Sequence, residues 1–198
     1  MVTQFYFIRH GETTSNAEKR YCGFLDEGLS EKGMLQAEKL HARMIHQSFD
    51  GIYSSDRKRA IQTAGIVFKN SSISPIPDLR EMHFGVFEGL NSHEIRKKYK
   101  SIYDSWVHDP YRVRIPEAET MNQFEKRIVK SIKIILSSHL DKTVAVVCHG
   151  GTISVLLNYF LKTKDFWKHL PGSASLNIVE CENDYNELKV FNDTSHLK

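Results

Sequence analysis

The chain has 198 residues, of which 27 are basic and 24 are acidic, so its formal net charge at pH 7 is +3. Hydrophobic residues make up 40% and charged residues 26% of the sequence, a globular composition that excludes wholesale disorder. Such a balanced charge is not that of a nucleic-acid coat, and no apolar run approaches the roughly 18 residues of a membrane span. We therefore expect one domain, residues 1–198, whose partners include neither nucleic acid nor a membrane.

The cysteines and the N-terminal segment indicate the compartment. Cys22, Cys148 and Cys181 are far apart in the chain and form no Cys-x-x-Cys pair. This spacing favours neither a disulfide framework nor a structural zinc site and is typical of reduced thiols. The N-terminal segment has no basic leader, and its apolar stretch is too short for a signal peptide. We expect a cytoplasmic protein.

Strands and helices alternate along the first part of the chain. Apolar and β-branched runs predict three strands: residues 5–8, residues 49–53 and residues 73–77. The third can be only an edge strand, because it contains two prolines that cannot donate to a ladder. Apolar residues at helical spacing predict two helices between these strands, one capped by Ser30 and one starting near residue 56.

The second part of the chain carries stronger signals. Thr120 and Gln123 form a capping box, and apolar residues at helical spacing follow them. Residues 143–148 are a continuous β-branched run, typical of a parallel strand that is covered on both faces. An apolar helix follows through residues 155–161. Two further runs flank Asn183-Asp184 and predict a terminal hairpin: residues 176–180 and residues 188–191.

Strands that alternate with helices imply an α/β fold, a three-layer αβα sandwich with a mostly parallel central sheet. In such sheets ligands bind beyond the carboxyl ends of the strands. The segment of about residues 79–118 is irregular apart from a short helix near residues 92–99. We interpret it as an insertion that covers the active site, rather than as a separate domain.

Two of the three clearest strands end in a histidine beside a glycine. His10 follows the first strand, and His149 follows the strand at 143–148. Arg9 adjoins His10, and Arg59 lies about one helical turn past Ser55, so it can point back towards the end of the second strand. A guanidinium binds two phosphate oxygens at once and an imidazole adds donors, so these residues predict a phosphate pocket.

A carboxylate on the loop after residue 79 completes the set. Glu81 and Glu88 both lie on this glycine-punctuated loop. A bound phosphate repels a nearby carboxylate and favours its protonated form, which is what a general acid needs. Glu81 is the first candidate for this role, and Glu88 competes with it.

Other residues have ordinary interpretations. Cys148 adjoins His149, but the residue six positions on is Ser154, where the cysteine-phosphatase loop needs an arginine. We therefore interpret Cys148 as buried packing. The remaining histidines show no shared metal-ligand spacing, so no metal site is expected, and Gly33 is followed by Met34 rather than by the lysine of a nucleotide P-loop.

Six motifs stand in one order along residues 5 to 160: residues 9–16, 20–26, 29–37, 53–64, 79–89 and 146–151. The first reads Arg9-His10-Gly11-Glu12-Thr13-x-x-Asn16 and the last Val146-Val147-Cys148-His149-Gly150-Gly151. Any one of them is weak, but together they resemble the histidine phosphatase superfamily, which is also called phosphoglycerate-mutase-like. The resemblance implies the fold of that superfamily.

The resemblance also implies a mechanism and roles for individual residues. His10 would attack phosphorus and become phosphohistidine, and Glu81 would act first as the acid and then as the base. The catalytic set would be completed by three residues that hold phosphate oxygens: Arg9, Arg59 and His149. Further phosphate contacts are expected from Thr13, Asn16, Cys22, Gly23 and Gly150. The resemblance implies neither a metal nor a cofactor, because cationic side chains take over the metal's electrostatic role.

The stretch between the acid loop and the second histidine is compact, which favours a phosphatase over a phosphoglycerate mutase. Within the phosphatases the chain looks most like those that act on α-ribazole 5′-phosphate in cobalamin synthesis. Fructose-bisphosphatase-like activity and a non-catalytic phospho-ligand module are the alternatives, and a homodimer is possible. Four aromatic residues could either stack on an aromatic leaving group or simply pack the insertion: Phe84, Phe87, Trp106 and Tyr111.

Overall fold

The computed structural model describes residues 2–182 and 185–198. In these ranges six strands form one sheet in the order β3-β2-β4-β1-β5-β6. Their bounds are Thr3–Arg9 (β1), Gly51–Ser54 (β2), Ser74–Pro75 (β3), Thr143–Cys148 (β4), Leu176–Glu182 (β5) and Tyr185–Asp193 (β6). The first four pair in parallel, which confirms the mostly parallel sheet, and β3 is the predicted edge strand.

The last two strands form the predicted C-terminal hairpin. β5 pairs antiparallel with β1 on one side and with β6 on the other. Asn183 and Asp184, where the sequence predicts the turn, lie outside the described residues. The sheet is therefore mixed, with an antiparallel edge added to its parallel strands.

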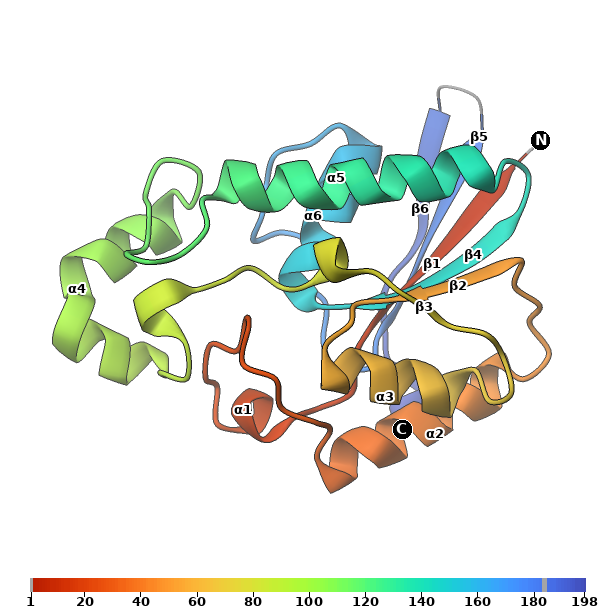
Figure 1. Ribbon diagram of the computed structural model, residues 1–198, viewed down its shortest axis with the longest axis horizontal. Coiled ribbons are helices and arrows are strands. Elements are labelled where there is room, and N and C mark those ends of the chain that lie inside the picture. The colour runs from red at the N-terminus through yellow and green to blue at the C-terminus, as the bar shows by residue number, and fades with distance from the viewer. Residues whose placement is uncertain (1, 183–184) are drawn as a thin grey trace.

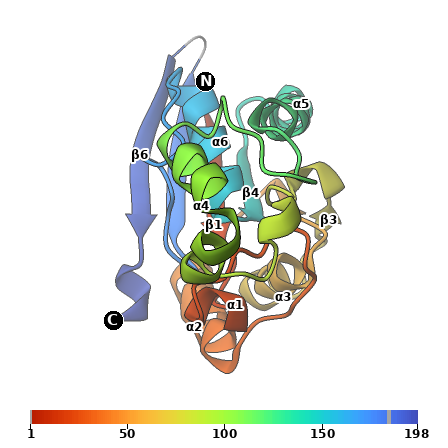
Figure 2. The same ribbon diagram turned by 90° about the vertical axis from the view of Figure 1, so that its left-hand side faces the viewer.

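Six α-helices are described: α1 (Thr14–Ala17), α2 (Glu31–Met44), α3 (Lys58–Val67), α4 (Ser92–His108), α5 (Met121–Ser138) and α6 (Gly150–Leu161). Short 3₁₀ turns are η1 (Pro77–Leu79), η2 (Gly85–Phe87) and η3 (Ser195–Leu197). The expected caps are present, because the Ser30 side chain accepts from the Gly33 amide and Thr120 forms a capping box with Gln123. α2 and α3 cover one face of the sheet and α5 and α6 the other, which confirms the three-layer sandwich (Figures 1 and 2).

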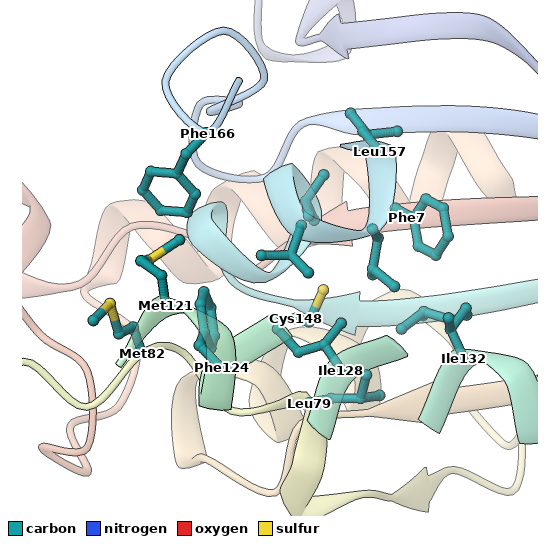
Figure 3. Close-up of a cluster of buried hydrophobic side chains, with 14 of the residues drawn as sticks. Phe7, Leu79, Met82, Met121, Phe124, Ile128, Ile132, Cys148, Leu157 and Phe166 are labelled. Atoms are coloured by element: carbon teal, nitrogen blue, oxygen red, sulfur yellow. The ribbon is translucent and has the colours of Figure 1, made fainter. Parts of the chain in front are cut away.

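Alternating residues of the central strands fill the two cores. On β1, Phe5 and Phe7 are fully buried in the cluster beneath α5 and α6, whereas Ile8 packs towards α2 and α3. Figure 3 shows the first cluster, with Phe7 from β1, Ile128 from α5 and Leu157 from α6. Each such side chain contributes roughly 1.5–3 kcal/mol through burial, so both faces of the sheet hold the strand ends in place.

One helix boundary was wrong. The predicted short helix near residues 92–99 continues to His108 as α4. Tyr99 has non-helical dihedral angles, φ −137° and ψ 34°, so the helix is kinked there, although its buried residues Ile95, Tyr103 and Trp106 keep one helical spacing across the kink. Tyr103 and Trp106 form the inner face of the second half. Figure 1 shows α4 beyond the carboxyl ends of the parallel strands; that this segment is an insertion over the active site stays a prediction.

The aromatic residues of this segment pack against one another. Phe87 is fully buried and Trp106 is 1% exposed, and both belong to the core cluster with Phe84. Tyr111 is half-buried and donates its hydroxyl to Glu125, 2.7 Å away. These contacts fit the packing interpretation rather than an open stacking wall. Among the described residues, no helix is both long and apolar enough to cross a membrane.

Candidate active site

The sheet places the two histidines side by side. β1 and β4 are parallel neighbours, and Arg9 is in register with Cys148, so the residue after each strand emerges at the same edge. The ring centroids of His10 and His149 are 5.1 Å apart, and the ring planes are inclined at 65°. The side chains are almost fully buried, with His10 4% and His149 1% exposed. Two imidazoles from distant parts of the chain therefore share one site.

The groups around His10 determine which of its ring nitrogens carries a proton and whether the ring is charged. Its Nδ1 lies 2.7 Å from the carbonyl oxygen of Gly11, and a carbonyl only accepts, so Nδ1 carries the proton. Burial, followed by the charges of Arg59 and Arg9, holds the pKa of His10 well below its usual 6.5. The ring is therefore neutral near pH 7, with an unprotonated Nε2. A neutral imidazole with a free lone pair is a competent nucleophile.

His149 has the opposite tautomer. Its Nδ1 accepts from Arg59 Nε at 3.3 Å, so Nε2 carries the proton and donates to the Ser55 hydroxyl at 2.8 Å. Burial and then Arg59 lower the pKa of His149 well below 6.5. Sequence reasoning missed Ser55 as a member of the site. Its position directly after β2 was the available signal, since His10 and His149 occupy the same position on their strands.

Arg59 joins this site to the loop at residues 22–25. It is 1% exposed and donates to the carbonyl oxygens of Leu25 at 2.7 Å, Gly23 at 2.8 Å and Cys22 at 3.2 Å. Cys22 and Gly23 thus present carbonyl acceptors to the guanidinium. In this arrangement they hold Arg59 in place, and a direct contact between either residue and phosphate stays a prediction.

Glu88 supports the same loop. Its carboxylate accepts backbone N–H groups from Gly23 at 3.1 Å, Phe24 at 2.9 Å and Phe84 at 2.9 Å. The amides on Glu88 belong to the loop at residues 22–25 and to Phe84, whereas Glu81 lies at the start of α6, directly after His149. The geometry therefore favours Glu81 over Glu88 as the acid.

Glu81 lies against the N-terminus of α6. One carboxylate oxygen accepts from the Gly151 amide at 2.8 Å and the other from the Met82 amide at 2.9 Å. Burial raises the pKa of Glu81 above its usual 4.5, against the opposing effects of these hydrogen bonds and of Arg9. A raised pKa favours the protonated form that a general acid requires.

Arg9 and Gly150 lie on the other side of the same helix terminus. Arg9 Nη1 donates to the Pro171 carbonyl at 2.6 Å, while its buried Nε has no hydrogen-bond partner among the described residues. A Cβ atom on Gly150 would stand 3.4 Å from the Arg9 guanidinium carbon, so the helix start packs directly on this cation. The unpaired donor and the helix N-terminus together suit a bound anion.

Thr13 and Asn16 form the capping box of α1. The Thr13 hydroxyl accepts from the backbone N–H of Asn16 at 3.2 Å, and Asn16 Oδ1 accepts from the backbone N–H of Thr13 at 3.2 Å. The Thr13 hydroxyl oxygen therefore accepts within the cap while its O–H remains a donor, and its predicted contact with phosphate stays a prediction. The side-chain nitrogen of Asn16 remains as a donor, and its predicted contact with phosphate stays a prediction.

Gly151 offers a test of the position of Glu81. A Cβ atom at residue 151 would lie 2.4 Å from Glu81 Oε1, so Gly151→Ala must displace the carboxylate. We expect kcat to fall about 10²-fold, the usual cost of a displacement near 1 Å at a reacting group. Gly65→Ala is the matched control, since nothing lies within 4 Å of its Cβ position. Steady-state kinetics of both variants check this, and equal activity in both would contradict it.

The arrangement can hold an anion between cations, present a nucleophilic nitrogen and supply a proton. Among the described residues there is no group of three or more His, Cys, Asp or Glu side chains that could hold a metal ion. Fold and site together thus describe a protein equipped for phosphoryl transfer at the carboxyl ends of parallel strands. The model of the histidine phosphatase superfamily (branch 1) matches residues 5–194, and the chain belongs to this superfamily as a phosphatase.

Individual relatives show which phosphatases and solved structures this chain is similar to. A metal-independent phosphoserine phosphatase of Arabidopsis thaliana is 31% identical over 201 residues, which cover 99% of this chain and 84% of the relative. An adenosylcobalamin/alpha-ribazole phosphatase of Salmonella typhimurium is 26% identical over 193 residues and 96% of both chains. The solved structure of Bacillus stearothermophilus YhfR is 30% identical with a TM-score of 0.92, and the match covers 99% of this chain and 100% of that one.

Proposed function

We propose that this phosphatase hydrolyses a small phosphomonoester through a phosphohistidine at His10, without a metal. The paired imidazoles, 5.1 Å apart with the His10 proton held on Nδ1, carry this proposal. His10 Nε2 attacks phosphorus, and the bond from phosphorus to the leaving oxygen breaks as Glu81 gives that oxygen its proton. Water then attacks the phosphohistidine, Glu81 takes up a proton, and phosphate leaves His10.

The cations have a separate part in this reaction. Arg9 and Arg59 neutralise the charge of the transferring phosphoryl group, and His149 and Asn16 add hydrogen-bond donors. Because burial weakens screening, each of these contacts is worth more than it would be in water. The free thiols of all three cysteines support our proposal that the reaction takes place in the cytoplasm.

We propose L-phosphoserine as the first candidate substrate. Arg57 lies with its guanidinium carbon 4.8 Å from the ring centroid of Phe24, on the loop that Arg59 holds. Arg57 Nε is buried and has no hydrogen-bond partner among the described residues, which leaves it for a substrate carboxylate. The 31% identity to the Arabidopsis phosphoserine phosphatase also supports this choice.

α-Ribazole 5′-phosphate, with a role in cobalamin synthesis, is the second candidate. The Salmonella relative supports it, but three of the four aromatic residues that could have stacked on its base, Phe84, Phe87 and Trp106, are buried in the core. Phosphoglycerate mutase and fructose-bisphosphatase-like activities are the remaining alternatives. The compact segment between Glu81 and His149 favours hydrolysis over transfer. The presence of all five expected catalytic residues, Arg9, His10, Arg59, Glu81 and His149, favours an enzyme over a non-catalytic module.

A phosphate-release panel in EDTA tests this proposal, with L-phosphoserine, α-ribazole 5′-phosphate, 3-phosphoglycerate with its bisphosphate primer, and fructose 1,6-bisphosphate. We expect the highest kcat/KM for phosphoserine and no loss in EDTA. Arg57→Met should raise KM for phosphoserine about 10-fold, the worth of one charge-assisted hydrogen bond, without affecting p-nitrophenyl phosphate. Lys58→Met, at a neighbouring exposed side chain, is the control. Isomerisation of phosphoglycerate without phosphate release would overturn the proposal.

The pH dependence should show both reacting groups. The reactive enzyme needs neutral His10, whose pKa lies well below 6.5, and protonated Glu81, whose pKa lies above 4.5. Lowering the pH protonates His10 and raising it deprotonates Glu81, so activity should be lost in both directions. We expect the acid limb of kcat/KM to lie well below pH 6.5, after allowance for the substrate's own ionisation near pH 6.

The Glu81→Gln variant distinguishes the two sides of the pH profile of kcat/KM. It should abolish the fall in activity at high pH and leave the fall at low pH in place. The measurement is kcat/KM for an alkyl phosphate across the pH range in both proteins. An acid limb centred at or above pH 6.5 would contradict the neutral state assigned to His10.

A further inference from the structure

An arginine on α5 holds the backbone of the loop that carries Glu81. The side chain of Arg127 is 17% exposed and its guanidinium turns towards this loop. Nη1 donates to the carbonyl oxygens of Asp78 and Arg80, both at 2.8 Å, and Nη2 donates to the carbonyl oxygen of Glu81 at 2.9 Å. Three carbonyls in four residues are thus fixed by one side chain.

Glu119 completes the arrangement. Its Oε2 accepts from Arg127 Nε at 3.0 Å and its Oε1 from Nη2 at 2.6 Å. The same Oε1 accepts the backbone amide of His83 at 2.9 Å, on the far side of Glu81. All five N–H groups of the guanidinium are therefore engaged. A lysine offers only three donors and no planar fork, so it could not reproduce this set of contacts.

Glu81 is consequently held from two directions. α5 fixes its main chain through Arg127, and α6 fixes its carboxylate through the Gly151 amide at 2.8 Å. Glu81 is also 9% exposed, so little solvent is available to compensate for a displaced contact. A shift of the loop would move the carboxyl group away from the leaving oxygen while leaving His10, on β1, in place.

We propose that Arg127 and Glu119 form a positioning pair that sets the catalytic geometry of Glu81. Neither residue touches the reacting atoms. The proposal rests on the proposed function, in which Glu81 is the general acid. Its consequence is specific to the first step, because a displaced acid slows formation of the phosphohistidine only where the leaving group needs a proton. An alkoxide needs one, whereas p-nitrophenolate leaves as a stable anion. The second step, in which Glu81 acts as the base, is common to all substrates.

Kinetics with two leaving groups test the pair. In Arg127→Lys, the rate constant of phosphohistidine formation, measured by rapid quenching in a single turnover, should fall about 10²-fold for an alkyl phosphate such as phosphoserine and stay nearly unchanged for p-nitrophenyl phosphate. Glu119→Gln should show the same pattern with a smaller factor. The amount of phosphohistidine trapped with p-nitrophenyl phosphate should be no lower than in the unmodified protein, because with this substrate only the breakdown of the intermediate uses Glu81. Lys126→Met, at an exposed lysine on the same helix, is the matched control.

The leaving-group pattern of the Glu81→Gln variant is the standard against which the Arg127→Lys variant is compared. If it shows the leaving-group pattern and Arg127→Lys does not, the positioning role is wrong. If Arg127→Lys slows both substrates equally, the pair merely maintains the fold and the inference is overturned. If Glu81→Gln itself slows both substrates equally, the failure lies in the proposed acid role. Thermal unfolding of each variant shows whether the protein is folded, and Glu119→Gln keeps the test usable if Arg127→Lys is not.

Discussion

Replacing His10 with asparagine should lower kcat on the order of 10⁴-fold or more, because the variant lacks the nitrogen that receives the phosphoryl group. Asparagine can still donate to the Gly11 carbonyl, which His10 Nδ1 reaches at 2.7 Å, so the local backbone should be preserved. The loss should be similar for alkyl and nitrophenyl substrates, since both must transfer their phosphoryl group to the same nitrogen. KM should change little, because the cations that hold the phosphate are intact.

Rapid quenching with a labelled substrate measures the intermediate directly. The unmodified protein should carry an acid-labile phosphoryl group on His10, and His10→Asn should carry none. His93→Asn, at an exposed histidine on α4, is the control and should retain both label and turnover. A labelled protein in His10→Asn would assign the nucleophile to another residue.

Replacing Arg59 with methionine should lower kcat/KM on the order of 10³-fold, the usual effect of removing one preorganised donor to developing charge. The physical reason is twofold. Arg59 lies within the same buried cluster as His10, and its Nε is the donor that orients His149. Its removal therefore takes away a positive charge and frees the second imidazole to rotate.

The same substitution should destabilise the fold by about 1–3 kcal/mol, because the carbonyls of Cys22, Gly23 and Leu25 lose their donor. Thermal unfolding measured beside the kinetics separates this cost from the chemical one. Arg59→Lys should restore charge and part of the activity but not the fork of hydrogen bonds. Arg112→Met, with its side chain 88% exposed, is the matched control. Near-normal kcat/KM in a folded Arg59→Met would show that Arg59 does not stabilise the transferring group.

The fold was largely readable from the sequence because each strand and helix carries a local signal. The β-branched run at 143–148 became β4, and the capping box at Thr120 opens α5. The failure at α4 has a local cause as well. Tyr99, where the predicted helix ended, does leave helical geometry, but the apolar spacing from Ile95 to Tyr103 and Trp106 continues through this kink.

The sequence by itself determined which residue types meet at the strand ends, because parallel strands bring their carboxyl ends to one edge. His10, Arg59, Glu81 and His149 could be chosen on that ground and on their motifs. Hydrogen-bond direction and burial were left to the tertiary structure, since both depend on neighbours that are distant in the chain. Only the folded molecule shows that the Glu88 carboxylate accepts the backbone amides of Gly23 and Phe24. It also shows that Glu81 is the carboxyl group whose pKa is raised by burial.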